Sequence, residues 1–494
     1  MSRSETNTDK DKTDLSATGI IKLIEEAQVR LFHSPLKEHY ATLWTKEHWE
    51  TWRIKSSTFE EWMASMCYHQ HGAVPSKQAI AEAKSVLAGR ALFGSPEGQV
   101  YVRVAGHKGA IYVDLANESW EAVRITGEGW DVVSGIPIKF IRAPGMKPLP
   151  LPVDCGSIDD LRSVLNFEDD DQWKLTESWL IGALRPVGPF PLLVVEGIHG
   201  SAKSTAARLL RALVDPNAAP LRAAPLSPRD LAISAENSWC LGFDNLSSVK
   251  PWLSDALCRL STGGGFSTRA LYRNADEWIF DGMRPVLLNG INIGIDRSDL
   301  LDRTIMLSLP VISDDSRQTE AEVWERFETL RPSILGGLFD AVAAALRRFP
   351  EIKLPRLPRM ADFATWVCAA EPALGWPEGS FLDVYRRNRS EADALALEAS
   401  PLVEPITRIA EREAWEGTAT ELHGVLTNEL LNCQVVVQGS FPKTPKELSQ
   451  AIRRLAPNLL RIGIAIQFSK TPGDKSKRIV SIRKVGVGVI QAAP

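Results

Sequence analysis

A short apolar run that leads into a glycine-containing loop constrains the fold of this chain more than any other feature. Residues 191–205 read P-L-L-V-V-E-G-I-H-G-S-A-K-S-T, and the helix-like run A-A-R-L-L-R-A-L-V follows. The pattern predicts a buried strand that ends at Val195, a tight loop from Gly197, and a helix that begins near Lys203. A strand, loop and helix in this order are typical of an α/β fold. We therefore expect an α/β core around this segment.

The loop has the residue types that a phosphate-binding loop requires. Gly197 and Gly200 let backbone N–H groups turn toward one point, where the helix N-terminus adds partial positive charge. Lys203 can reach the terminal phosphates of ATP, and the Ser204 hydroxyl can bind Mg²⁺. Ala202 replaces the glycine that usually precedes the lysine but is still small; the alternative is a chance loop between a strand and a helix. The expected nucleotide-binding residues are Gly197, His199, Gly200, Ser201, Ala202, Lys203, Ser204 and Thr205.

Two further apolar runs end in polar side chains. Residues 239–243 lead into Asp244, and residues 285–288 lead into Asn289. Because the carboxyl ends of parallel strands meet at one edge of a sheet, both side chains are expected beside the loop. There Asp244 would hold Mg²⁺ across from Ser204, and Asn289 would bond the γ-phosphate or the attacking water. The alternatives are an aspartate that caps the next turn and an ordinary Asn-Gly turn.

The residue after Asp244 leaves the identity of the general base open. Asn245 stands where a second acid is expected, and an amide can orient water but cannot take a proton at neutral pH. Glu196 and Asp255 are the carboxylates that could substitute for that acid.

The segment after the third predicted strand carries two arginines, Arg297 and Arg303, within D-R-S-D-L-L-D-R-T-I at 296–305. An arginine that reaches the γ-phosphate of a neighbouring subunit accelerates hydrolysis by about 10³–10⁵ where such residues are known. Surface ion pairs with the aspartates of the same segment are the alternative for both arginines.

A hairpin is expected between the second and third strands. Ser267–Tyr272 and Glu277–Phe280 can pair around a turn at 273–276, which places Arg269 and Arg273 near its tip. A second phosphate loop just before the hairpin is less favoured, because no Lys-Ser/Thr pair follows its glycines.

Four features together resemble the superfamily-three replicative helicases of the AAA+ class. They are the loop, the strand that ends in Asp244, the hairpin segment T-G-G-G-F-S-T-R-A-L-Y-R-N and the strand that ends in Asn289. The resemblance covers about residues 186–312 and is strongest to the primase-helicase type of phages, plasmids and integrated elements. It implies a hexameric ring with ATP between subunits and with the hairpin in a central pore that contacts DNA. The arginines to which it gives roles are Arg269 and Arg273 for the DNA phosphates, and Arg303, then Arg297, for the ATP of the next subunit.

Basic residues gather near the end of the chain. Between residues 443 and 484 there are eleven Lys and Arg against two acids, although the whole chain has a net charge of −4. A helix start at 444–447 and two strand-like runs, 462–468 and 478–482, resemble a winged helix whose basic face binds DNA by releasing counterions. A solvated basic surface is the alternative. The expected DNA-binding residues of this region are Lys446, Arg453, Arg454, Lys470, Lys475, Lys477 and Arg478.

The rest of the chain divides by pattern and composition. Apolar residues at helical spacing predict a helical block from 19 to 93, with its tryptophans in the core. Short β-branched runs at 100–104, 111–113 and 138–141 predict a small sheet, and the Pro-rich segment 143–152 predicts a linker. We thus expect a disordered tail over 1–18, an N-terminal, collar-like α+β domain over 19–155, an AAA+-like ATPase core over 156–312, a helical region over 313–400 and a winged helix over 401–494.

Composition limits the class of protein. With 44% hydrophobic and 24% charged residues, the chain is neither wholly disordered nor fibrous. It has no apolar run near 18 residues and no apolar leader, which favours a cytoplasmic location without membrane contact. The six cysteines are scattered, which is typical of reduced thiols, and the close set Cys67, His69 and His71 lacks a fourth ligand for zinc.

These features favour an ATP-dependent DNA helicase or translocase that replicates a mobile element, with ATP and Mg²⁺ as cofactors and forked or single-stranded DNA as partner. An ATP-binding switch or DNA-bound regulatory or defence ATPase is the alternative that Asn245 suggests. A small-molecule P-loop kinase is a third reading, which the basic C-terminal region disfavours.

Overall fold

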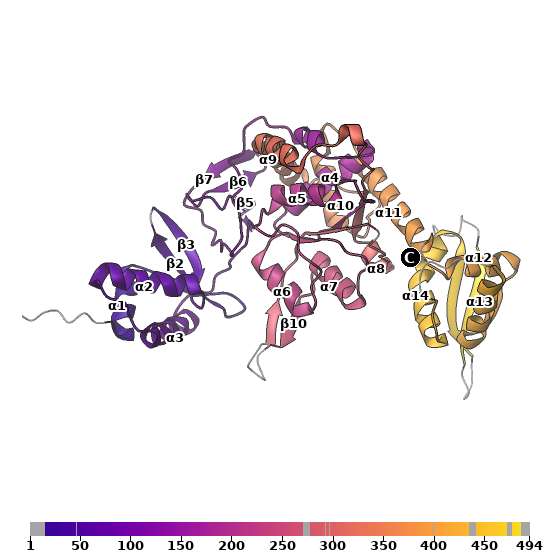
Figure 1. Ribbon diagram of the computed structural model, residues 1–494, viewed down its shortest axis with the longest axis horizontal. Coiled ribbons are helices and arrows are strands. Elements are labelled where there is room, and N and C mark those ends of the chain that lie inside the picture. Colours follow the sequence, from indigo (N-terminus) through magenta and orange to yellow (C-terminus); the bar gives the residue numbers. More distant parts are fainter. Residues whose placement is uncertain are drawn as a thin grey trace, which may run out of the picture. The chain divides into compact units, whose positions relative to one another are not determined.

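The computed structural model describes residues 15–45, 47–269, 277–291, 293–295, 297–398, 400–433, 441–471 and 477–485 (Figure 1). The chain forms two compact units. The first contains Met1–Leu151 with the short segments Asp215–Ala218 and Glu236–Trp239, and the second contains the remainder.

The first unit has two small antiparallel sheets. Its elements in chain order are α1 (Ala17–Glu26), β1 (Arg30–His33), β2 (His39–Thr45), β3 (His48–Arg53), α2 (Ser57–His71), α3 (Lys77–Phe93), β4 (Val104–His107), β5 (Ala110–Asp114), β6 (Ala122–Thr126) and β7 (Gly129–Val133). Strands β1 to β3 form one sheet, and β4 to β7 form a meander in sequence order. The expected strand at 138–141 is absent from the described fold, where Phe140 makes a single bridge to Tyr101. Arg103, which is fully buried, pairs with Asp215 at 3.1 Å.

The expected helical block is wrong between residues 30 and 53, which form three strands. Trp44 and Trp49 are directly opposite each other on β2 and β3, so their spacing reflects strand pairing across a tight turn. Trp44 is 52% exposed and does not lie in the core. Trp52 does pack on the core, with its ring 6.2 Å from that of Trp62 on α2.

The second unit is built on a parallel sheet, which confirms the expected α/β class. Its strands are β8 (Leu192–Glu196), β9 (Leu241–Phe243), β12 (Val286–Gly290) and β13 (Thr304–Ser308), in the order β13-β8-β12-β9. The strands are mostly apolar, as is typical of a parallel sheet that helices cover on both faces. Helices α5 (Lys203–Val214), α6 (Pro228–Asn237), α7 (Pro251–Thr262) and the short α8 (Ser298–Leu301) connect them. Strand β12 lies between β8 and β9, so the asparagine strand is the central one of the three that carry predicted site residues.

A helical layer packs against this core. It contains η1 (Ile158–Val164), α4 (Asp170–Ala183), η2 (Asp314–Ser316), α9 (Glu320–Arg348), α10 (Ala361–Ala370), η3 (Glu371–Leu374) and α11 (Ser380–Glu398). By length and composition α9 could cross a membrane, but 61% of its most apolar stretch is buried inside the unit, as in the core helix of a soluble protein.

The C-terminal region of this unit has its own apolar core. Its elements are α12 (Val403–Arg412), β14 (Trp415–Thr418), α13 (Ala419–Cys433), α14 (Pro445–Arg461), β15 (Ile464–Lys470) and β16 (Arg478–Lys484). The strands form an antiparallel sheet in the order β14-β16-β15. Helix α14 buries Leu448, Ile452 and Leu459 against this sheet, which leaves its basic residues outside.

Candidate nucleotide site

Three of the predicted residues converge at the carboxyl edge of the parallel sheet. The Nδ2 of Asn289 donates a hydrogen bond to Ser204 Oγ at 2.9 Å and another to Asp244 Oδ1 at 2.7 Å. Ser204 Oγ in turn donates to Asp244 Oδ1 at 3.3 Å. Because β12 pairs with both β8 and β9, Asn289 lies between the loop that follows β8 and the aspartate that follows β9. The edge therefore gathers a hydroxyl, a carboxylate and an amide.

The loop between β8 and α5 depends on small residues. A Cβ at Gly197 would lie 2.4 Å from Ser201 Oγ and 2.9 Å from the carbonyl oxygen of Leu309, so no larger residue fits there. Gly200 has a φ of +85° and Ala202 a φ of +57°, both in the left-handed region that glycine adopts most readily. The conformation of Ala202 explains physically why glycine usually occupies that position.

Two buried polar atoms at this edge have no hydrogen-bond partner among the described residues, namely Ser201 Oγ and Asn289 Oδ1. Lys203 makes no ion pair with any residue that the structure describes. Hydroxyl, carboxylate and amide oxygens are the ligand types that Mg²⁺ takes, and a helix N-terminus beside a lysine suits phosphate. The residues present therefore fit a magnesium nucleotide. His199 is exposed in the loop, and Thr205 is half-buried in the first turn of α5.

The two substitute bases differ in their surroundings. Glu196 ends β8, its Oε1 accepts a hydrogen bond from the backbone N–H of Ile293 at 2.8 Å, and burial raises its pKa. Asp255 is held by Arg297 at 2.6 Å. Asn245 has a φ of +55°, and its backbone N–H, rather than its side chain, contacts Asp244 Oδ1 at 2.9 Å. Glu196 is thus the carboxylate that accompanies Asp244 at the sheet edge.

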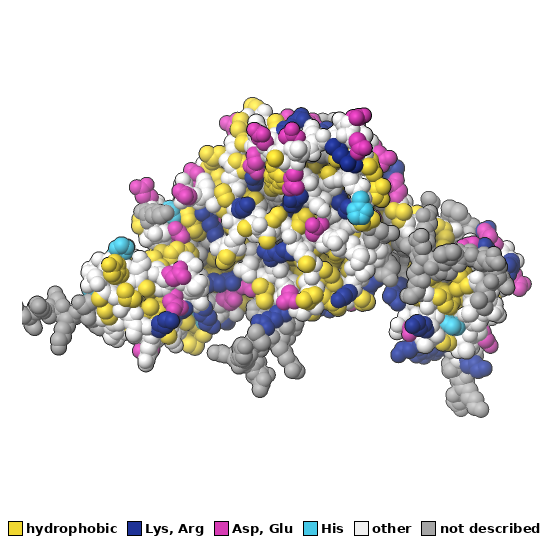
Figure 2. All heavy atoms as spheres, viewed as in Figure 1, with side chains coloured by type: hydrophobic (Ala, Val, Ile, Leu, Met, Phe, Trp, Pro, Cys, Tyr) yellow, Lys and Arg dark blue, Asp and Glu magenta, His cyan; other side chains and the backbone are white. Residues whose placement is uncertain are grey.

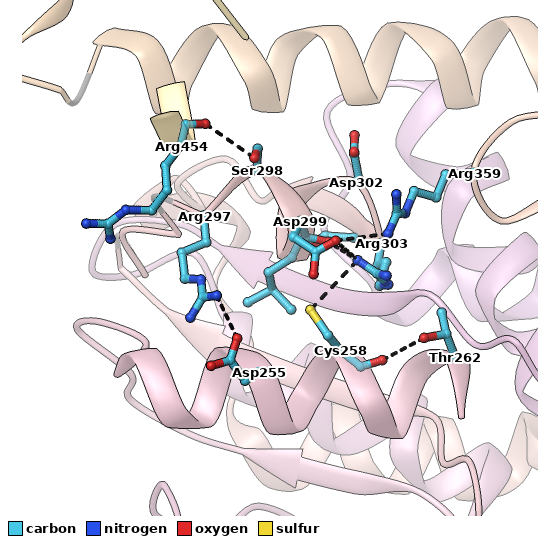
Figure 3. A network of polar contacts seen from close by, with 12 residues as sticks. Asp255, Cys258, Thr262, Arg297, Ser298, Asp299, Asp302, Arg303, Arg359 and Arg454 are labelled. Carbon is cyan, nitrogen blue, oxygen red and sulfur yellow. Dashed lines mark hydrogen bonds and ion pairs between the residues drawn. The ribbon is translucent and has the colours of Figure 1, made fainter. Parts of the chain in front are cut away.

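The two arginines after β12 are both engaged within their own chain (Figure 3). Arg303 is buried, pairs with Asp299 and lies 3.9 Å from Cys258 Sγ. Arg297 pairs with Asp255 on α7 and donates to the carbonyl oxygen of Pro251 at 3.0 Å. The ion-pair alternative is therefore observed for Arg303, and for Arg297 the partner is one that the sequence did not suggest.

The predicted hairpin is formed by β10 (Phe266–Arg269) and β11 (Glu277–Phe280), which pair with Phe266 opposite Phe280 and Arg269 opposite Glu277. The described part of the first strand ends at Arg269, and residues 270–272 of the expected strand lie outside the described residues. Arg273 and the rest of the turn lie outside the described residues.

The predicted DNA-binding residues of the C-terminal region are exposed where the structure describes them. These are Lys446, Arg453, Arg454, Lys470, Lys477 and Arg478, whereas Lys475 lies outside the described residues. Arg453 lies over the ring of Phe468, 3.8 Å from its centroid, which ties α14 to β15. Lys and Arg side chains gather along one edge of this region (Figure 2).

Sequence reasoning missed the segment that follows β13. Ile312 donates its backbone N–H to the carbonyl oxygen of Gly200 at 3.2 Å, and Arg317 Nη2 would lie 3.4 Å from a Cβ at Gly200. Strand β13 pairs with β8, so the residues after both strands meet at one edge. The apolar run 304–309 was the available signal for a fourth strand.

The fold defines a mixed α/β protein whose parallel sheet gathers Ser204, Asp244 and Asn289 at one edge. A family model described as the actinomycete integrative conjugative element replication protein matches residues 158–395, and a model of the RepA C-terminal domain of these elements matches residues 399–492. From residue 158 onward, the chain is therefore similar to the replication-protein family of actinomycete integrative conjugative elements. It is a replication-associated protein of a mobile element.

Solved structures with low identity were also found. The apo NrS-1 C-terminal region is 13% identical, with a TM-score of 0.40, over 94% of this chain and 99% of that chain. JCV helicase with a bound acetamide compound is 13% identical, with a TM-score of 0.21, over 45% of this chain and 66% of that chain. No curated protein matches the sequence.

Proposed function

We propose that this chain is an ATP-dependent DNA helicase or translocase that acts during replication of an integrated mobile element. The observation that carries the proposal is the junction of Ser204, Asp244 and Asn289 beside the loop 197–203. A hydrogen-bonded hydroxyl, carboxylate and amide at a helix N-terminus support phosphoryl chemistry more directly than any other function. The basic C-terminal region supports a nucleic-acid partner.

Each residue at the sheet edge has a distinct role in this proposal. Ser204 and Asp244 would hold Mg²⁺, which neutralises charge on the phosphates when bound. Lys203 and the backbone of the loop would orient the terminal phosphate. The free Oδ1 of Asn289 would accept a hydrogen bond from the attacking water, and Glu196 would take its proton.

The coupling to DNA follows the family resemblance. ATP would bind between the subunits of a ring. Arg303 of the next subunit, or Arg297 as second choice, would contact its terminal phosphate. For that role, Arg303 has to exchange its partner Asp299 for the phosphate. The β10–β11 hairpin, with Arg269 and Arg273, would contact the strand in the pore, while α14 and β15–β16 would act as a winged helix.

The substitution Lys203→Ala tests the motor directly. We expect DNA-stimulated ATP turnover to fall to background, because the terminal phosphate loses its cation. Phosphate release with forked DNA is the measurement, and Lys250→Ala, at an exposed lysine outside the loop, is the control. Arg273→Ala in the same assay should retain basal turnover and lose strand displacement. Full turnover in Lys203→Ala would refute the nucleotide site.

A second candidate function is an ATP-binding switch on DNA. The observation that favours it is Asn245. Its side-chain amide cannot accept a proton, and its backbone N–H already donates a hydrogen bond to Asp244. If the wild type binds DNA more tightly with ATP but neither turns it over repeatedly nor separates strands, the switch replaces the motor.

A further inference from the structure

The second unit has a cleft of about 620 Å³, and none of its lining residues belongs to the nucleotide loop. Its walls come from the segment 356–359, from α11 and from the C-terminal end of α14. Among the lining residues are five arginines and one acid, Asp393. The arginines are Arg356, Arg359, Arg386, Arg389 and Arg461.

Carboxylates on neighbouring elements orient several of these guanidinium groups. Asp302, directly after α8, accepts from Arg389 and, at 3.3 Å, from Arg461, which also pairs with Asp393. Arg359 pairs with Asp299 at 2.9 Å; both residues are visible in Figure 3. A guanidinium has five N–H donors, so these pairs leave donors available for another acceptor.

Arg356 differs from the other cleft arginines because it has no acidic partner among the described residues. Its positive charge is not offset by a neighbouring carboxylate. The cleft therefore retains cationic character despite the aspartates that hold its other arginines.

Two polar atoms in the cleft wall make no hydrogen bond with the part of the chain that the structure describes. The hydroxyl of Tyr385, a residue only 1% exposed, and Oδ1 of Asn458, a residue only 3% exposed, make no hydrogen bond with the described residues. Burial raises the pKa of Tyr385 to about 12, so its hydroxyl keeps its proton and can donate. An unpaired buried polar group costs about 1–3 kcal/mol, which a ligand with matching groups would recover.

We propose that this cleft binds phosphate groups of the nucleic acid that the C-terminal region holds. Arginine forks match phosphate oxygens in pairs, and the Tyr385 hydroxyl supplies one further donor. The cleft lies at the end of α14, the helix whose exposed side chains include Lys446, Arg453 and Arg454. A strand on that helix could thus continue into the cleft. The proposal rests on the nucleic-acid partner of the proposed function but not on ATP hydrolysis.

The experiment measures fluorescence anisotropy of a fluorescein-labelled single-stranded oligonucleotide with the full chain and without ATP. Tyr385→Phe and Arg356→Ala should each weaken binding about tenfold. Arg356→Ala should also lower the slope of log affinity against log salt by about 0.7, the value for one phosphate on a single strand. Arg326→Ala, which removes an exposed arginine of α9 outside the cleft, is the charge-matched control.

Stability distinguishes binding from folding in this experiment. Tyr385→Phe removes an unpartnered hydroxyl without removing the ring, so its unfolding midpoint should equal or exceed that of the wild type. Weaker binding at unchanged stability supports the cleft. Unchanged affinity in both variants, with normal binding by the wild type, overturns it.

A nucleotide arm identifies the source of the phosphate. In the Lys203→Ala background, a fluorescent ATP analogue is titrated with and without Tyr385→Phe. Binding that persists in Lys203→Ala but is lost in the double variant would show that the cleft takes free nucleotides, which supports its phosphate chemistry. If the wild type binds neither the oligonucleotide nor the analogue, the cleft proposal and the proposed function both fail. If Lys203→Ala alone loses turnover while the cleft variants bind normally, only the cleft proposal fails.

Discussion

The strained loop residue Ala202 offers a test at the level of a single side chain. A φ of +57° is energetically unfavourable for an L-residue such as alanine but not for glycine. Ala202→Gly should therefore bind a nucleotide at least as tightly as the wild type, with an unfolding free energy within about 1 kcal/mol, because glycine also makes the unfolded chain more flexible. Titration with a fluorescent ATP analogue and urea unfolding measure both quantities. A large loss of affinity would contradict this account of the loop.

Glu177 on α4 makes stability depend on pH. It is 2% exposed, its Oε2 has no partner among the described residues, and burial raises its pKa from 4.5 to about 9. The folded state therefore binds this proton more tightly than the unfolded state, so its contribution to stability is greatest below pH 4.5 and declines as pH rises toward about 9. Glu177→Gln should flatten that decline and melt higher than the wild type at pH 8. An equal pH dependence in both proteins, measured by thermal unfolding, would disprove the assignment.

At the level of elements, two adjacent glycines let α9 approach the start of η1 and the segment before it. A Cβ at Gly336 would lie 2.0 Å from the carbonyl oxygen of Val153, and one at Gly337 would lie 2.6 Å from the backbone nitrogen of Ile158. Gly336→Ala should destabilise the protein by about 2 kcal/mol or more, although alanine is the better helix former. Gly424→Ala on α13, where a Cβ meets nothing within 4 Å, should stabilise it by about 0.5–1 kcal/mol. Urea unfolding that gives the same sign for both would be evidence against close packing.

The elements also show what the sequence could reveal. The strand before Gly197 and the runs before Asp244 and Asn289 were predictable because buried parallel strands are continuous apolar runs. The spatial order β8-β12-β9 was not predictable, because the sequence gives the order of the strands along the chain but not which strands pair. Strands β2 and β3 were missed because aromatic residues across a hairpin reproduce helical spacing. The partner of Arg303, Asp299, lies four residues away and was among the alternatives, whereas the partner of Arg297, Asp255, depends on how α8 packs on α7, which no local pattern encodes.

At the level of the whole molecule, the C-terminal region has a core of its own, formed by α12 to β16 with Leu397 and Leu402. A chain that ends at residue 398 should retain nucleotide binding, because the loop and its partners all lie before that point, and should lose most of its ATP-independent affinity for duplex DNA. Anisotropy at two salt concentrations checks this, since a phosphate-dominated interface weakens steeply with salt. Full duplex affinity in the shortened chain would remove the winged-helix role.

The central position of β12 restricts how the replication protein can vary. Side chains of a strand alternate between its two faces, so a shift of one residue would point Leu288 or Gly290 at Ser204 and Asp244 and turn the amide away. An odd insertion between the hairpin and this strand is therefore tolerated only if the connecting loop absorbs it. We expect lengths in that loop to vary freely among family members while the spacing from Val286 to Asn289 stays fixed.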